Sequence, residues 1–139
     1  MNPITILLAD DHTIVREGLK ALLALEDDIK VIGEATNGHQ AVTLAHELVP
    51  DIVILDLAMP LLNGMDAIQR IKECTTSSTK LLILSSYDDE AYIRHARSLG
   101  ASGYLVKQSD ANSLADAIRQ IHQGGVYFRP THSLPVQCP

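Results

Sequence analysis

The stretch Asp51–Pro60, DIVILDLAMP, contains a run of large aliphatic residues that stops at Asp56. A second apolar run, Ile4–Ala9, stops at the acidic pair Asp10 and Asp11. Runs this apolar are typical of parallel strands covered by helices on both faces, so the first polar residue after each run lies at the carboxyl edge of the sheet. Open α/β sheets bind their ligands at that edge. We therefore expect the three carboxylates to meet in one crevice.

Three carboxylates in one crevice repel one another, since each pair at about 4 Å costs roughly 4 kcal/mol at an effective dielectric constant of about 20. A hard divalent cation relieves this repulsion, and oxygen ligands are typical of Mg²⁺. The sequence therefore predicts a magnesium site made by Asp10, Asp11 and Asp56 with the backbone carbonyl of Ala58. Asp56 is also the candidate nucleophile, because a carboxylate can attack phosphorus to form an aspartyl phosphate. Taken alone, a strand-terminal aspartate is more often a helix cap or a turn residue.

Composition limits the class of protein. A chain of 139 residues with 46% hydrophobic and 20% charged residues is typical of one globular domain with its own core. The net charge of −6 argues against a DNA-binding surface and against attraction to an anionic membrane. The first residues lack the basic start of a secretion signal, and no apolar run is long enough to span a bilayer. We expect a soluble, cytoplasmic protein.

Apolar runs alternate with segments of helical period along the chain. This alternation predicts a three-layer α/β domain with a parallel five-stranded sheet and right-handed crossovers. Thr13 is the candidate N-cap of the first helix, whose expected apolar stripe includes Ile14, Leu19 and Leu23. The expected strands are Ile4–Ala9, Lys30–Ala35, Ile52–Asp56, Lys80–Ser85 and Gly103–Lys107.

The fourth helix, about Glu90–Leu99, has the weakest apolar face. It is either a short surface helix or a loosely held element of the kind that moves during function. After Gly125 the helical pattern breaks, and the remaining residues contain three prolines. We therefore expect a domain over residues 1–125 and a linker or tail over residues 126–139.

Two further strand ends carry polar side chains. Lys107 ends the apolar run GYLV and is expected to pair with a phosphoryl oxygen at the same edge of the sheet. Ser85 ends the run KLLIL and offers a hydroxyl that can donate to such an oxygen. Each residue alone could be an ordinary strand-end lysine or turn serine. Together with the carboxylates they form a more specific constellation.

The chain resembles the receiver domain of two-component response regulators from about Ile4 to Gln123. The motifs that carry the resemblance are LLADDH, DIVILDLAMPLLNGMDAI, LLILSSYDD and GASGYLVK, in the family's order and spacing. The resemblance implies a flavodoxin-like (βα)5 fold with strand order 2-1-3-4-5. It assigns Asp56 as the phosphoacceptor, Asp10 and Asp11 as the acidic metal pocket, Ser85 as the switch hydroxyl, Tyr104 as the switch aromatic and Lys107 as the conserved-type lysine.

The resemblance also implies a mechanism and a partner. A sensor histidine kinase would present a phosphohistidine, and the receiver would itself catalyse transfer to Asp56 with Mg²⁺, without being an enzyme for other substrates. Ser85 and Lys107 would then move to the phosphoryl oxygens, and Tyr104 would turn inward. The face formed by the fourth helix, fifth strand and fifth helix would report the change, through dimerisation or release of a DNA-binding domain.

The segments ADDH, VREGLKALL and GGVYFRP resemble the NarL/LuxR-type subgroup, whose members usually continue into a DNA-binding domain. This chain has no recognition-helix pattern, so we expect no direct contact with nucleic acid by these residues. It is either the receiver of a longer transcription factor or a stand-alone receiver acting in a phosphorelay or in protein–protein interaction. Gln108 follows Lys107 where many receivers have proline, which leaves the isomer of that peptide bond open.

Three rival functions fit the sequence less well. A phosphatase with an aspartate nucleophile would need a second acid at position 58, where this chain has Ala58. A flavin-binding module would need a glycine- and hydroxyl-rich loop after the first strand, where this chain has an acidic pair. A receiver-like interaction module that no longer accepts phosphate would not need Asp56, Ser85 and Lys107 together.

Overall fold

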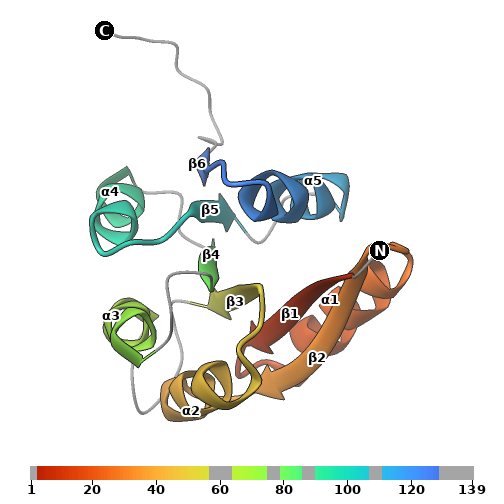
Figure 1. Cartoon of the computed structure of the whole chain (residues 1–139), viewed down its shortest axis with the longest axis horizontal. Helices are drawn as coiled ribbons and strands as arrows, with labels where there is room; N and C mark the ends of the chain where they lie inside the picture. Colours follow the sequence, from red (N-terminus) through yellow and green to blue (C-terminus); the bar gives the residue numbers. More distant parts are fainter. Residues whose placement is uncertain (1–2, 57–63, 75–78, 86–89, 107–110, 129–139) are drawn as a thin grey trace, which may run out of the picture.

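The computed structural model describes residues 3–56, 64–74, 79–85, 90–106 and 111–128. Within these residues the chain forms one sheet with helices on both faces (Figure 1). The strands are β1 Ile4–Ala9, β2 Ile29–Ala35, β3 Ile52–Asp56, β4 Lys80–Ser85, β5 Gly103–Val106 and β6 Tyr127–Phe128. The helices are α1 Thr13–Ala24, α2 Gly38–Leu48, α3 Gly64–Cys74, α4 Glu90–Ser98 and α5 Ala111–His122.

The sheet is parallel, and its strand order is β2-β1-β3-β4-β5-β6. The expected α/β class and the order 2-1-3-4-5 are confirmed, with β6 added beside β5. Successive strand residues point to opposite faces, so each strand supplies both layers of the core. One face packs on α2, α3 and α4 and the other on α1 and α5 (Figure 1). The strands are therefore buried on both sides, as their apolar sequences predict.

The two core clusters show how the strands divide their side chains. In β3, Val53 and Leu55 belong to the cluster under α2, α3 and α4, whereas Ile52 and Ile54 belong to the cluster under α1 and α5. All four are 0–2% exposed. The polar residue that follows them, Asp56, is therefore held in place by a rigid strand.

The buried face of helix α1 differs from the apolar stripe that the sequence predicts. Ile14 is 86% exposed, whereas Leu23 is buried and Leu19 packs against the core beside it. The expected cap is also wrong, because His12 occupies the N-cap position and Thr13 is the first helical residue. Leu19 and Leu23 lie one helical turn apart on a single face, and Ile14 lies on another.

Strand β6 lies within the segment that the sequence assigned to a linker or tail. Gly124, at a φ of 99°, follows α5 in the left-handed conformation that glycine tolerates best. The Tyr127 amide then donates to the Ser102 carbonyl at 2.9 Å and joins the chain to β5. Phe128 packs on the core cluster under α2, α3 and α4, and Arg97 lies 4.8 Å from the centre of its ring.

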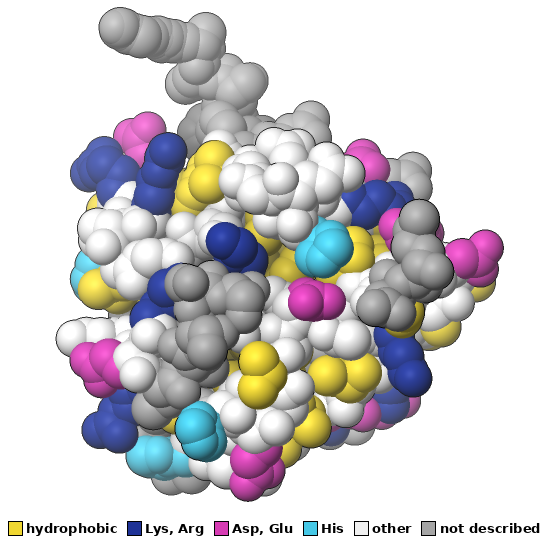
Figure 2. All heavy atoms as spheres, viewed as in Figure 1, with side chains coloured by type: hydrophobic (Ala, Val, Ile, Leu, Met, Phe, Trp, Pro, Cys, Tyr) yellow, Lys and Arg dark blue, Asp and Glu magenta, His cyan; other side chains and the backbone are white. Residues whose placement is uncertain are grey.

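The surface carries charges of both signs. On the face shown in Figure 2, basic and acidic side chains are interspersed among the coloured residues, without one broad basic patch. Within the residues that the structure describes, every helix is too short or too polar to traverse a lipid bilayer.

Candidate functional site

Three neighbouring strands end in buried polar residues at one edge of the sheet. Asp10 follows β1 and is 3% exposed, Asp56 ends β3 and is 2% exposed, and Ser85 ends β4 and is 1% exposed. Residues Ala9 and Leu55 pair across β1 and β3, which places the two strand ends side by side. The convergence predicted from the apolar runs is therefore present in the structure.

The acidic cluster consists of Asp10, Asp11 and Asp56 together with His12. One potential ligand atom from each of these four residues lies within 4.8 Å of the others. Asp56 ends β3, and Asp10 and Asp11 directly follow β1, so two strands fixed by the core bring the cluster together. Its three carboxylates suit a hard divalent cation, as the sequence predicts.

The loop between β1 and α1 is shaped by the Asp10 side chain. The Asp10 amide donates to the Ala35 carbonyl at 3.0 Å, which continues the pairing of β1 with β2. The His12 amide then donates to Asp10 Oδ1 at 2.8 Å. This local bond turns the chain sharply at the strand end, so that α1 begins at Thr13.

His12 is the functional candidate that sequence reasoning missed. It follows the acidic pair directly in the sequence, and its side chain is 56% exposed. Its Nδ1 atom nevertheless lies 2.9 Å from Asp10 Oδ1, 3.2 Å from Asp11 Oδ1 and 3.8 Å from Asp56 Oδ2. The only sequence signal was the adjacency itself, because the direction of the ring depends on the backbone at the start of the helix.

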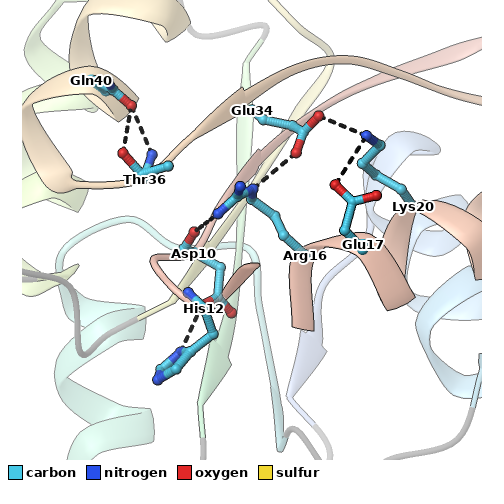
Figure 3. A network of polar contacts seen from close by, with 8 residues as sticks. All are labelled: Asp10, His12, Arg16, Glu17, Lys20, Glu34, Thr36 and Gln40. Atoms are coloured by element: carbon cyan, nitrogen blue, oxygen red, sulfur yellow. Dashed lines mark hydrogen bonds and ion pairs between the residues drawn. The ribbon is translucent and has the colours of Figure 1, made fainter. Parts of the chain in front are cut away.

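A second polar network holds the loop from the side of α1 (Figure 3). Arg16 donates from Nη1 to the Asp10 carbonyl at 2.9 Å and from Nε to Glu34 Oε1 at 2.9 Å. Lys20 Nζ lies 2.9 Å from the other oxygen, Glu34 Oε2. Hydrogen bonds from Lys20 and then Arg16 lower the pKa of Glu34 below its usual value, and the bond to Glu34 raises the pKa of Lys20. Glu34 in β2 thus holds Arg16 in place, and Arg16 in turn binds the Asp10 carbonyl.

The structure describes some of the other predicted site residues and leaves the rest outside the described ranges. Tyr104 in β5 is 1% exposed and packs in the cluster under α2, α3 and α4, so its ring already lies inward. Ser85 pairs with Val106, the last residue of β5, at the same edge. Lys107, the next residue, lies outside the described residues, as do Ala58 and Gln108.

The similarity to known proteins agrees with this geometry. The family model described as "Response regulator receiver domain" matches residues 6–119. The chain belongs to the response regulator receiver family. This result confirms the resemblance drawn from the four sequence motifs.

Relatives of this receiver include transcriptional regulators. It is 41% identical to the transcriptional regulatory protein DegU of Brevibacillus brevis, over 96% of this chain and 57% of DegU. It is 39% identical to the nitrate/nitrite response regulator NarL of Escherichia coli K12, over 88% of this chain and 56% of NarL. The receiver therefore spans little more than half the length of these relatives.

Solved structures agree with the expected subgroup. A LuxR-family two-component response regulator from Aurantimonas sp. SI85-9A1 has a TM-score of 0.86 and 35% identity, covering 91% of this chain and 89% of that chain. The signal receiver domain of NarL from Mycobacterium tuberculosis has a TM-score of 0.83 and 29% identity, covering 89% of this chain and 99% of that domain. The receiver is thus related to NarL- and LuxR-type regulators.

Proposed function

We propose that this receiver accepts a phosphoryl group on Asp56 from a sensor histidine kinase in the cytoplasm. The observation that carries the proposal is the convergence of buried Asp56 with Asp10 and Asp11 at the carboxyl edge of the sheet. A carboxylate held by a rigid strand, with two further carboxylates beside it to hold a cation, is what phosphoryl transfer to an aspartate requires.

In the proposed reaction, an Asp56 carboxylate oxygen attacks the phosphorus of a phosphohistidine. The new P–O bond forms as the P–N bond breaks, and the electron pair of that bond stays on the imidazole nitrogen of the kinase. Asp10, Asp11, Asp56 and the Ala58 carbonyl would hold Mg²⁺, which when bound neutralises the negative charge gathered at the phosphoryl group. Asp10 is kept in place by the Ala35 carbonyl and by Arg16.

The switch residues are proposed from the family pattern and from their places in the sheet. Ser85 at the end of β4 and Lys107 after β5 would bind the phosphoryl oxygens, with Tyr104 packed behind them. Because Tyr104 is already buried, an inward turn on phosphorylation is not needed in the arrangement seen here. Phosphorylation would instead stabilise this arrangement relative to one with the ring outside.

The proposed output is control of transcription through a DNA-binding region of a longer protein. Support comes from relatives named as transcriptional regulators, of which this receiver covers little more than half. The face of α4, β5 and α5 would carry the signal by dimerisation. Action as a stand-alone receiver in a phosphorelay is the alternative, and it requires the same chemistry at Asp56.

The test is the intact mass of the receiver after incubation with Mg²⁺ and acetyl phosphate. We expect one hydroxylamine-sensitive phosphoryl group on the wild type and none on Asp56→Asn. The matched control is Asp27→Asn, which removes an exposed carboxylate in the turn before β2 and should leave the adduct unchanged. An adduct that persists on Asp56→Asn would show that another residue is the acceptor.

A wild type without any adduct would be examined with beryllofluoride, which mimics the aspartyl phosphate and does not turn over. Stabilisation of the wild type by beryllofluoride, absent in Asp56→Asn, would indicate rapid loss of the phosphate. If beryllofluoride has no effect on either protein, Asp56 is not a phosphoacceptor.

A further inference from the structure

The imidazole of His12 lies where a fourth ligand of the acidic cluster would lie. Its Nδ1 is 2.9, 3.2 and 3.8 Å from one oxygen each of Asp10, Asp11 and Asp56. Neighbouring ligands at right angles on an ion with bonds of about 2.1 Å are about 3.0 Å apart, and opposite ligands are about 4.2 Å apart. The distances of 3.2 and 3.8 Å lie between these limits, and the distance of 2.9 Å lies just below the lower limit.

A simple helix cap or surface hydrogen bond explains this position less well. The backbone amide of His12, rather than its ring, already bonds Asp10 Oδ1 and turns the chain into α1. The Nδ1 atom carries at most one hydrogen, so it can donate to only one of the three carboxylates that it approaches at a time. As a metal ligand, Nδ1 would use its lone pair, with the ring proton on Nε2.

We infer that His12 is a nitrogen ligand of this pocket, which makes it a mixed oxygen and nitrogen site. Imidazole suits first-row transition metals, whereas Mg²⁺ strongly prefers oxygen. The receiver should therefore discriminate in favour of an ion such as Mn²⁺ to a degree that depends on His12. The inference rests on the proposed metal pocket and deepens it, because it names the residue that sets the choice of ion.

The first measurement is pulsed electron paramagnetic resonance of the receiver with bound Mn²⁺. We expect a hyperfine coupling from a directly bound imidazole nitrogen in the wild type, and its loss in His12→Ala. A second variant, His12→Phe, keeps a ring at this position without a donor nitrogen and should also lack the coupling. The matched control is His95→Ala, which removes an exposed histidine of α4 and should retain the coupling.

The second measurement is the affinity for Mn²⁺ and for Mg²⁺, measured separately on the same proteins. We expect His12→Ala to weaken Mn²⁺ binding by about 10-fold or more and to change Mg²⁺ binding much less, so that the preference for Mn²⁺ falls. Circular dichroism of each variant checks that it is folded. A merely structural role of His12 would weaken both ions alike and would give no nitrogen coupling.

The possible results separate this inference from the proposed function. If Mn²⁺ binds the wild type but shows no nitrogen coupling, the inference is wrong and the carboxylate pocket stands. If both ions bind more tightly to His12→Ala, the ring competes with the cation, and the inference is again wrong. If neither ion binds the wild type, the metal pocket itself is wrong, whatever the acetyl phosphate experiment shows.

Discussion

At the scale of single residues, Glu34 shows how a side chain outside the acidic cluster supports it. Glu34 accepts from Arg16 and pairs with Lys20, and Arg16 in turn holds the Asp10 carbonyl. The bonds from Lys20 and Arg16 keep the folded-state pKa of Glu34 below its ordinary value of 4.5. Ionised Glu34 therefore stabilises the fold at pH values above about 4.5, and this contribution is lost as the pH falls through the lower, folded-state pKa.

Replacing Glu34 with glutamine tests this reading. We expect Glu34→Gln to lower the melting temperature by about 2–4 °C at pH 7, because both cations lose their charged partner. The difference from wild type should shrink as the pH falls below about 4.5, where the wild-type carboxylate also loses its charge. Thermal unfolding followed by circular dichroism at several pH values measures both effects.

The control for this prediction is Glu17→Gln, which removes an exposed carboxylate that contacts Lys20 at 3.5 Å. It should change the melting temperature less than Glu34→Gln. A gap between wild type and Glu34→Gln that stays constant down to pH 3 would contradict an ion-pairing role for Glu34.

At the scale of elements, the sequence predicted where the strands end but did not predict which face of α1 is buried. The apolar runs specified where the strands end, because a buried strand tolerates its first polar residue only at the sheet edge. They could not specify which side of α1 faces the sheet, since Ile14 and Leu23 are both apolar and only Leu23 is buried. The place of His12 was missed for the same reason, because it depends on how the helix is set against β1.

Replacing a glycine with alanine is expected to stabilise the receiver in α1 and to destabilise it in β5. Gly18 lies in the exposed middle of α1, and a Cβ there would have no heavy atom within 4 Å. Gly18→Ala should therefore stabilise the receiver by about 0.5–1 kcal/mol, since alanine lowers the backbone entropy lost when the helix forms. Urea unfolding followed by circular dichroism measures the difference.

The same substitution at Gly103 provides the comparison. A Cβ there would lie 2.7 Å from Ile121 Cδ1, 2.8 Å from Leu82 Cδ1 and 3.1 Å from the Tyr127 carbonyl oxygen. Gly103→Ala should destabilise the receiver by about 1–3 kcal/mol through overpacking. Stabilisation by Gly103→Ala would mean that β5, β6 and α5 pack less closely than the structure shows.

At the scale of the whole molecule, the last strand, β6, is the part of the sheet that the sequence did not predict. Strand β6 has two residues and stands shortly before Pro130, so it carries no period that distinguishes it from a linker. It forms because α5 returns the chain to the edge of β5, where Tyr127 and Phe128 pack on opposite sides of the sheet. Strands β1 to β5 were predictable from local sequence, whereas β6 depends on tertiary contacts.

The beginning and the end of the domain are joined by Arg119 of α5. Its Nε and Nη2 atoms donate to the two carboxylate oxygens of Asp28 at 2.8 and 2.9 Å, and Nη2 also contacts Glu26. Arg119 and Asp28 are 91 residues apart in sequence. Hydrogen bonding to Arg119 lowers the pKa of Asp28. This two-pronged pairing holds α5 to the turn between α1 and β2 more firmly than a single surface contact would.

Removing the pairing between Arg119 and Asp28 should lower the stability of the whole domain. We expect Arg119→Gln to lower the melting temperature by about 2–4 °C at low ionic strength, and by less in about 1 M NaCl, where surface charges are screened. Arg94→Gln is the matched control, because Arg94 forms an ion pair with Glu90 at 3.6 Å on an exposed face of α4. It should change the melting temperature by less than Arg119→Gln in either salt. Equal effects of the two variants would show that the fork between Arg119 and Asp28 contributes no more than an ordinary surface pair.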